Sequence, residues 1–296
     1  MEARVQRRVQ RYGWDLASRD YEALWQAQLA PARTALLDWA ALRPGEAVLD
    51  VACGTGLVAL PAAEAVGPAG RVCGIDIAGR MVEAAAAGAT ARGLRHATFA
   101  RMDAESLALP DASFDVAFCA LGLMYVPDPG AAVREMRRVV RPGGRVLVSV
   151  WGPRARCGWA GVFGIVEAEV ASDVCPLFFA LGERGALARE CAAAGLALQR
   201  EALVATTLRY ADTEEACSAA FVGGPVALAW SRFDEDTRLR AAARYAASIA
   251  AWRDDDGYAL PGEFVVVEAA RPPQASRFVC GAGALRPPER AATAGR

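Results

Sequence analysis

The residues best suited to chemistry follow an apolar stretch near position 50. Val48-Leu49-Asp50-Val51 reads as a buried strand, and Ala52-Cys53-Gly54-Thr55-Gly56 reads as the glycine-rich turn after it. Because Gly54 and Gly56 have no side chain, such a turn lets backbone N–H groups approach a nucleotide-like ligand. The pattern therefore predicts a ligand cradle, with Cys53 as a small apolar filler inside it.

Two further acidic residues follow apolar stretches in the same way. Asp76 comes directly after Arg71-Val72-Cys73-Gly74-Ile75, and an acid at this distance from the glycine turn can accept hydrogen bonds from both hydroxyls of a ribose. Asp103-Ala104 follows a third such stretch and is placed to meet an adenine edge. A structural role stays open for Asp50, as a cap of the glycine turn, and for Asp76, as a cap of the next helix.

The order and spacing of these motifs resemble one protein family. Together with Phe114-Asp115 and Arg141-Pro142-Gly143-Gly144-Arg145, they are similar to the class I S-adenosylmethionine (SAM)-dependent methyltransferases, in the branch of the ubiquinone and menaquinone biosynthesis enzymes. The resemblance covers residues 45–152 and implies SAM as the cofactor. It implies cofactor contacts from Tyr12, Asp50, Ala52, Cys53, Gly54, Gly56, Asp76, Ile77, Met81, Asp103, Ala104, Cys119 and Ala120.

The residues leave two other functions open. A nicotinamide-dependent oxidoreductase would also use a glycine-rich turn, but the third glycine of G-x-G-x-x-G is expected where this chain has Ala59. A SAM-binding protein without catalytic activity is also compatible, because methyl transfer needs few obligatory side chains. The main hypothesis is methyl transfer to an oxygen, carbon or nitrogen atom of a small, largely apolar molecule.

Methyl transfer to a hydroxyl or an enolic carbon needs a group that takes up a proton. Tyr125 is the preferred catalytic candidate, and Tyr21, Tyr125, Trp151 and Trp159 are expected to contact the substrate, with ordinary packing as the alternative for each. The only histidine, His96, falls at the opposite edge of the predicted sheet from the pocket. No cluster of His, Cys and carboxylate residues has metal-ligand spacing, so no metal is expected.

The composition narrows the partners and the compartment. With 33 basic and 34 acidic residues the net charge is −1, so neither nucleic acid nor an anionic membrane is expected as a partner. The charged start predicts no signal peptide, and no apolar run reaches the length of a membrane span. Eight scattered cysteines without a CxxC pair indicate buried thiols in a cytoplasmic protein. The oligomeric state stays open, a homodimer included.

Alternating strands and helices predict an α/β fold. We expect a doubly wound, Rossmann-like, mostly parallel sheet of seven strands whose last strand, Phe264–Glu268, is antiparallel, together with a helical cap. Residues 1–44 would form an N-terminal helical lid, 45–152 the SAM-binding core, 153–285 the rest of the sheet with the substrate cap, and 286–296 a disordered tail. Ligands of such sheets bind at the carboxyl ends of the strands, so the cap should define the substrate.

Overall fold

The computed structural model describes residues 2–170 and 178–273, which share one mixed sheet with strand order β3-β2-β1-β4-β5-β8-β6. The short β7 pairs with β8 beside this path. The strands are β1 (Ala47–Val51), β2 (Arg71–Asp76), β3 (Ala97–Arg101), β4 (Phe114–Ala120), β5 (Val140–Trp151), β6 (Ala197–Tyr210), β7 (Arg253–Asp254) and β8 (Gly257–Ala270). The predicted disordered tail, 286–296, lies outside the described residues.

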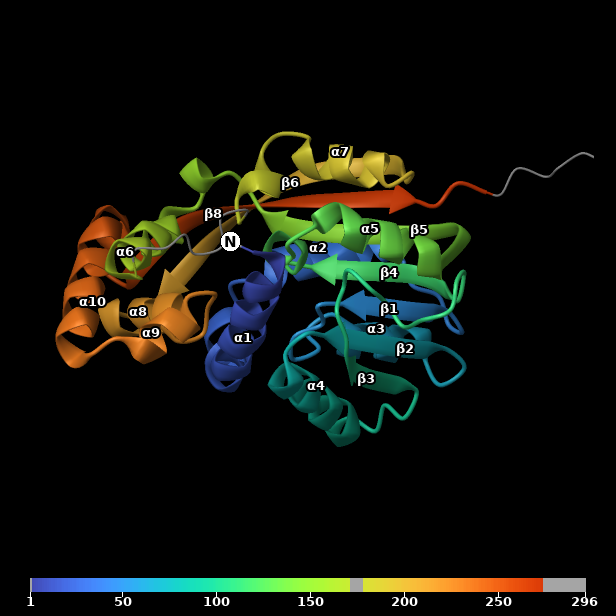
Figure 1. The fold of residues 1–296 in the computed structure, drawn as a ribbon, viewed down its shortest axis with the longest axis horizontal. Coiled ribbons are helices and arrows are strands. Elements are labelled where there is room, and N and C mark those ends of the chain that lie inside the picture. The colour runs from blue at the N-terminus through green and yellow to red at the C-terminus, as the bar shows by residue number, and fades with distance from the viewer. Residues whose placement is uncertain (1, 171–177, 274–296) are drawn as a thin grey trace, which may run out of the picture.

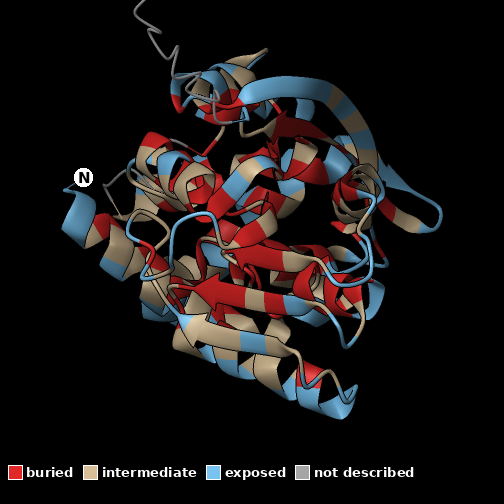
Figure 2. Cartoon of the chain, turned by 90° about the vertical axis from the view of Figure 1, so that its right-hand side faces the viewer, coloured by how far each residue is buried: buried red, intermediate tan, exposed pale blue. Residues whose placement is uncertain are grey.

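The pairing of the strands confirms the predicted fold class. Strands β1 to β5 pair in parallel, whereas β8 runs antiparallel to both of its neighbours, β5 and β6. Val48, Leu49, Val116 and Ala117 of the central strands are fully buried, as expected of parallel strands that are covered on both faces. In Figure 2 the buried residues accordingly concentrate along the middle of the sheet.

Helices lie on both faces of the sheet, with α5 in front of it and α2 behind it in Figure 1. The helices are α1 (Ala3–Trp25), α2 (Ala30–Ala40), α3 (Ala59–Val66), α4 (Gly79–Ala91), α5 (Pro129–Val139), α6 (Gly161–Val170), α7 (Ala186–Ala193), α8 (Thr213–Phe221), α9 (Ala227–Arg232) and α10 (Glu235–Ile249). Local sequence starts α5, because Asp128 accepts a hydrogen bond from the Ala131 amide and Pro129 is the first helical residue.

The N-terminal helix α1 lies where the parallel strands end. In Figure 1 the arrowheads of β1 and β4 point towards α1, and α6, α8, α9 and α10 group on its other side. Strands β6 and β8 are long enough to extend from the sheet to this group. The chain therefore places one long helix and a helical group over the carboxyl edge of the sheet. The division of the chain into a lid, a core and a cap stays a prediction.

Strand β5 is longer than the sequence indicates. Arg141-Pro142-Gly143-Gly144 has the residue types of a turn, yet β5 begins at Val140 and runs through it. Phe114 pairs with Val140 and Val116 pairs with Arg145, so the turn is accommodated as an irregularity in the register with β4.

Candidate functional site

A cavity lies between α1 and the carboxyl ends of five strands; we call it the main cavity. Its β1–β3 wall comprises Ala52, Gly54, Ile75, Asp76, Ile77, Met81, Met102, Asp103, Ala104 and Glu105. Its β4–β5 wall comprises Ala120, Leu121, Gly122, Met124, Tyr125, Val126, Pro127, Trp151 and Trp159. The remaining lining is Arg7, Gln10, Trp14, Tyr21, Trp25, Leu29, Gly224 and Pro225. Neighbouring strands lie about 4.8 Å apart, so the cavity extends over roughly 19 Å from β3 to β5.

The turn after β1 has an unusual backbone at the cavity wall. Ala52 and Gly54 have φ angles of 56° and 53°, in the left-handed region that side chains other than glycine rarely adopt. A Cβ atom built on Gly54 would meet nothing nearer than a Tyr21 ring carbon at 3.9 Å. Backbone conformation, rather than lack of space, therefore favours glycine at position 54, and the turn offers an uncovered surface to a ligand.

The turns after β1 and β4 touch each other through Gly122. A Cβ atom on Gly122 would lie 2.3 Å from the Ala52 Cβ, far inside any normal contact. The adjacent Leu121 also has a left-handed backbone, with φ of 57°. Strained backbone of this kind costs about 1–3 kcal/mol per residue and gathers at functional sites. The two turns thus fix each other's position at the middle of the cavity.

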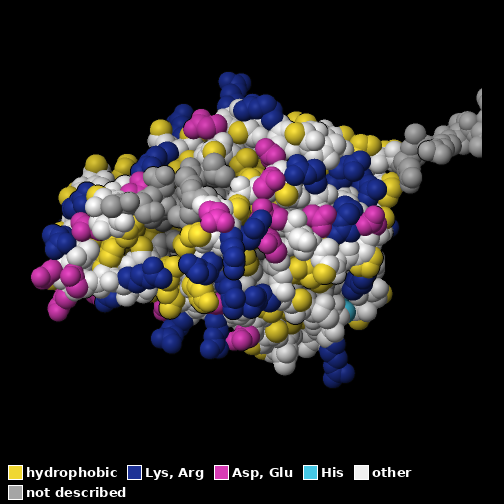
Figure 3. Space-filling view, viewed as in Figure 1, with side chains coloured by type: hydrophobic (Ala, Val, Ile, Leu, Met, Phe, Trp, Pro, Cys, Tyr) yellow, Lys and Arg dark blue, Asp and Glu magenta, His cyan; other side chains and the backbone are white. Residues whose placement is uncertain are grey.

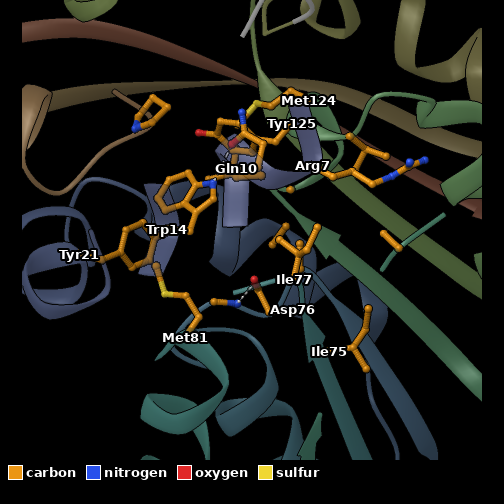
Figure 4. A pocket seen from close by; sticks show the side chains of 18 of the residues that line it. Arg7, Gln10, Trp14, Tyr21, Ile75, Asp76, Ile77, Met81, Met124 and Tyr125 are labelled. Atoms are coloured by element: carbon orange, nitrogen blue, oxygen red, sulfur yellow. Dashed lines mark hydrogen bonds between the residues drawn. The ribbon is translucent and has the colours of Figure 1, made fainter. Parts of the chain in front are cut away.

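Asp76 ties the glycine turn to the end of β2. One carboxylate oxygen accepts a hydrogen bond from the Gly54 amide at 3.0 Å and the other accepts one from the Ala78 amide at 2.9 Å. Figure 4 shows Asp76 opposite Trp14 and Tyr125 across the cavity. Burial raises the pKa of Asp76 to about 6, although both hydrogen bonds act in the opposite direction. The side chain therefore caps the local backbone and also lines the cavity, with lone pairs left for a ligand.

Asp50 lies beneath the turn rather than in the cavity wall. It is buried, and within the described ranges no side chain or backbone group donates a well-aligned hydrogen bond to either carboxylate oxygen. Burial raises the pKa of Asp50 to about 8; the Ala59 backbone amide acts in the opposite direction, and the charge of Asp76 adds to the rise. A buried acid with so little compensation is costly, and such perturbed groups concentrate at functional sites.

An ion-pair cluster closes the β3 end of the cavity. The Arg7 Nε of α1 lies 2.6 Å from a Glu105 carboxylate oxygen and 3.1 Å from an Asp103 oxygen. Glu105 and the charge of Asp103 raise the pKa of Arg7, although burial acts against them. This guanidinium therefore brings the start of α1 to the acidic turn after β3.

Further contacts hold α1 along its length. Asp15 accepts a hydrogen bond from the Arg80 amide at 2.9 Å, in the first turn of α4. The Trp25 indole donates to the Ala219 carbonyl of α8 at 3.2 Å. The helix is thus fastened to the core by its first half and to the helical group by its last residue, and its inner face covers the cavity.

Aromatic side chains surround the β4–β5 half of the cavity. The Tyr125 ring lies edge-on to Trp14, with centroids 5.1 Å apart, and to Phe178, at 5.3 Å. Trp159 packs in the same way on Trp25 at 5.8 Å and on Trp151 at 5.0 Å. The charged lining residues, Arg7, Asp76, Asp103 and Glu105, all lie elsewhere, on α1 or the β1–β3 wall. This half of the cavity is therefore aromatic and uncharged.

The structure brings most of the predicted site residues to the main cavity. Those that line it are Tyr21, Ala52, Gly54, Asp76, Ile77, Met81, Asp103, Ala104, Ala120, Tyr125, Trp151 and Trp159. Those that do not are Tyr12, Asp50, Cys53, Gly56 and Cys119. His96 lies apart from the cavity, as expected, and its ring Nε2 is 2.8 Å from the Ala63 carbonyl oxygen.

The exceptions have physical reasons. Tyr12 lies on the outer face of α1 and is 48% exposed, because two residues after Gln10 a helix has turned by roughly 200°. Cys53 and Cys119 are buried thiols behind the turns. A Cβ atom on Gly56 would lie 3.0 Å from Leu60, so this glycine faces α3 rather than a ligand.

Of the α1 residues that line the main cavity, only Tyr21 was among the predicted site residues. Arg7, Gln10, Trp14, Tyr21 and Trp25 all line it, at spacings of three, four and seven residues. These intervals place the five side chains on one helical face. The periodicity was readable in the sequence, but the surface that this face covers was not. Gly224 and Pro225, in the loop after α8, had no such signal.

The cysteines and acids form neither a disulfide nor a metal site in the part of the chain that the structure describes. Cys53, Cys73, Cys119, Cys157, Cys191 and Cys217 are free, and burial raises the pKa of the Cys119 thiol to about 12. Within residues 2–170 and 178–273, no three His, Cys, Asp or Glu side chains are grouped so as to hold a metal ion. No helix in those ranges is long and apolar enough to cross a membrane. Cys175 and Cys280 lie outside the described residues.

Comparison with known proteins gives consistent matches. A family profile described as a methyltransferase domain matches residues 48–144. Nocamycin O-methyltransferase from Saccharothrix syringae is 34% identical over 237 residues, which cover 75% of this chain and 84% of that protein. A demethylmenaquinone methyltransferase from Anoxybacillus flavithermus is 40% identical over 106 residues, covering 36% of this chain and 45% of that protein. The second match spans less than half of the relative.

Solved structures share the fold. A putative methyltransferase from Bacillus halodurans superposes with a TM-score of 0.60 at 20% identity, covering 81% of this chain and 98% of that one. The [4+2]-cyclase SpnF superposes with a TM-score of 0.56 at 25% identity, covering 82% of this chain and 81% of that one. At 20% identity, the likeness to the Bacillus halodurans protein concerns the fold alone.

Proposed function

The chain belongs to the SAM-dependent methyltransferases of small molecules, and we propose that its acceptor is largely apolar and binds in the aromatic half of the main cavity. The proposal rests chiefly on one observation. The cavity half at the ends of β4 and β5 is walled by Tyr125, Trp151 and Trp159 and carries no charged side chain.

The β1–β3 half of the cavity fits SAM. The left-handed backbone at Gly54 leaves a part of the turn without a Cβ atom, where the amino-acid end of the molecule would lie. We assign the ribose hydroxyls to the Asp76 carboxylate and the adenine edge to Asp103 and Ala104. Ile77, Met81 and Met102, which line the same wall, would pack on the rings.

Bound SAM supplies a methyl group on a sulfonium that departs as a neutral leaving group. The chain's own residues mainly have to hold the acceptor atom close and aligned, a positioning effect that is worth up to about 7–11 kcal/mol. Ala120 and Gly122 lie at the middle of the cavity, between its two halves. We place the transfer there, above the contact between the turns after β1 and β4.

Burial would provide most of the acceptor's binding energy. At about 25 cal/mol per Å² of apolar surface, a small ring system gains several kcal/mol against the tryptophan walls. One relative is named for nocamycin and another for demethylmenaquinone. These names favour a small organic acceptor and give no support to a nucleic-acid one, in keeping with the net charge of −1.

Tyr125 is the polar group that we assign to the acceptor. Trp14 and Phe178 hold its ring edge-on, so its orientation is fixed. The hydroxyl would orient the nucleophile of the acceptor or accept the nucleophile's proton through a water molecule. Tyr125→Phe should lower turnover about tenfold or more, on the order of one positioned acid or base, while the affinity for SAM stays nearly intact.

A matched control separates this role from general damage. Tyr258→Phe removes a hydroxyl that is 2.9 Å from the Thr213 hydroxyl, at a position that does not line the cavity. It should leave turnover unchanged. Equal turnover in Tyr125→Phe and the unaltered protein would refute the assigned role.

The likeness to a [4+2]-cyclase keeps one alternative in view, a SAM-binding protein that does not transfer the methyl group. The two functions differ in their products. Methyl transfer yields S-adenosylhomocysteine and a methylated acceptor in equal amounts. Conversion of a small molecule without consumption of SAM would favour the alternative.

A further inference from the structure

A second cavity lies beside the main cavity, between α1 and the ends of β2 and β3; we call it the arginine groove. Its lining is Arg7, Arg8, Arg11 and Tyr12 from α1, with Ile77, Arg101, Met102 and Asp103 from the sheet side. Four guanidinium groups thus line one groove together with a single carboxylate. In the space-filling view, arginine side chains gather over α1 (Figure 3). Nothing in the methyl-transfer chemistry uses this cluster.

The positive charge of the groove is only partly compensated. Arg7 is paired with Asp103 and Glu105. Arg8, Arg11 and Arg101 form no ion pair with any residue in 2–170 or 178–273. The Nε of Arg11 is buried and has no hydrogen-bond partner within the same ranges. A buried guanidinium donor without a partner is a cost that a bound acceptor would remove.

The spacing of the arginines adds to this cost. Arg4, Arg7, Arg8 and Arg11 are three and four residues apart, so they share one helical face, where like charges repel each other. A bound anion would relieve this repulsion between the arginines.

We propose that the arginine groove binds a phosphate group. Guanidinium groups match the oxygens of phosphate in pairs of parallel hydrogen bonds, and several of them around one groove favour a polyvalent oxyanion over a carboxylate. The half-exposed Tyr12 ring lies beside Arg11, whose Cζ is 5.3 Å from the ring centroid. The ring supplies a flat wall for the organic part of the phosphate-bearing molecule.

The groove and the main cavity share Arg7, Ile77, Met102 and Asp103. A phosphate that draws on Arg7 changes the charge at Asp103, the residue assigned to the adenine edge. Phosphate and cofactor should therefore alter each other's affinity by the same factor. This coupling rests on the proposed function, whereas the phosphate site itself does not.

The test is titration calorimetry of the full-length protein with inorganic pyrophosphate at low ionic strength. Saturable binding is expected, and the double variant Arg8→Gln, Arg101→Gln should weaken it tenfold or more. Arg19→Gln, an exposed arginine of α1 that does not line the groove, is the matched control and should bind like the unaltered protein. Unchanged affinity for S-adenosylhomocysteine in the double variant shows that it is folded.

Two further arms identify the source of the phosphate and test the coupling. Sedimentation with phosphatidylglycerol-containing vesicles, compared with phosphatidylcholine vesicles, detects a lipid headgroup as the source; groove-dependent binding to pyrophosphate alone indicates a soluble molecule. Repeating the titration with saturating S-adenosylhomocysteine should change the pyrophosphate affinity severalfold, and an equal affinity would overturn the coupling. Absence of saturable binding, or equal binding by the double variant, would overturn the site.

Discussion

At the scale of single residues, two buried carboxylates with different surroundings lie at the β1–β3 side of the main cavity. Asp76 accepts two backbone hydrogen bonds and lines the cavity, whereas Asp50 accepts no well-aligned hydrogen bond among the described residues and lies beneath the turn. The two carboxylates therefore have different roles. Asp76 can contact a ligand directly, whereas Asp50 can affect a ligand only through the position of the turn and the local charge.

Replacing Asp76 by Asn should weaken SAM binding. The substitution keeps the shape of the side chain but removes the charge that strengthens hydrogen bonds to two hydroxyls. A loss of about 1.5–3 kcal/mol corresponds to a roughly 10- to 150-fold higher dissociation constant, measurable by titration calorimetry. Glu64→Gln, which alters an exposed ion pair with Arg92, is the control and should bind normally. Unchanged affinity in a folded Asp76→Asn protein would remove the ribose assignment.

Asp50 should make the ligand-free protein less stable as the pH rises. Its pKa is about 8 in the folded chain, against an ordinary value of 3.8 when unfolded. Between these pH values the folded state holds a proton that the unfolded chain has released, so the free energy of unfolding falls with increasing pH. Thermal unfolding of the ligand-free protein should show a melting temperature that declines from about pH 5 to pH 8. Asp50→Asn should flatten this decline, and an equally steep decline in the variant would exclude Asp50 as its cause.

At the scale of elements, the site depends on contacts between segments that are distant in the sequence. The turn after β1 meets the turn after β4 at Gly122, and α1 reaches the turn after β3 through Arg7. The turns after β1 and β4 follow buried strands, so the sheet sets their positions to within the strand spacing. The contacts between the turns then fix their exact positions relative to each other.

Gly122→Ala should disturb this contact and with it the cofactor site. The added methyl group would lie 2.3 Å from the Ala52 Cβ, so one of the two turns must move. We expect a lower melting temperature and at least tenfold weaker SAM binding, since overpacking typically costs about 1–3 kcal/mol. Gly122 has a φ of −100°, so alanine there is not strained by the backbone itself. Gly164→Ala in α6, whose added methyl group would meet nothing nearer than 3.6 Å, is the comparison for the same change without overpacking. Equal SAM affinities for the two variants would show that the contact between the turns does not matter.

The sequence predicts elements better than it predicts their contacts. The cavity positions of Gly54, Asp76 and Asp103, which we assign to the cofactor, could be predicted because each residue lies at or within a few residues of the end of the strand that places it. The contributions of Gln10, Trp25 and Pro225 depend on how α1 and the loop after α8 fold back over the sheet, which no local pattern encodes. Tyr12 illustrates the limit, because a helix separates residues two positions apart onto nearly opposite faces.

At the scale of the whole molecule, different strand ends along the carboxyl edge of the sheet carry different kinds of side chain. The ends of β1, β2 and β3 carry the polar groups assigned to the cofactor, and the ends of β4 and β5 carry the aromatic groups assigned to the acceptor. The antiparallel strand β8 and the long β6 extend past this edge to the helical group (Figure 1). The alternation of strands and helices predicted a sheet with a helical cap over its carboxyl edge. The identity of the acceptor could not be predicted in the same way, because the side chains assigned to it come from segments that are distant in the sequence.

The central claim is that the chain transfers a methyl group to a small, largely apolar acceptor in the aromatic half of the main cavity. Its most direct test is incubation of the purified protein with SAM that carries a deuterated methyl group and a panel of small phenolic, enolic and amine compounds, with mass spectrometry of every product. The account predicts a small molecule that gains the deuterated methyl group, one equivalent of S-adenosylhomocysteine, turnover that survives exhaustive metal chelation, and about tenfold or greater loss in Tyr125→Phe. Transfer of the label only to protein or nucleic acid, or a product formed without the label, would contradict it.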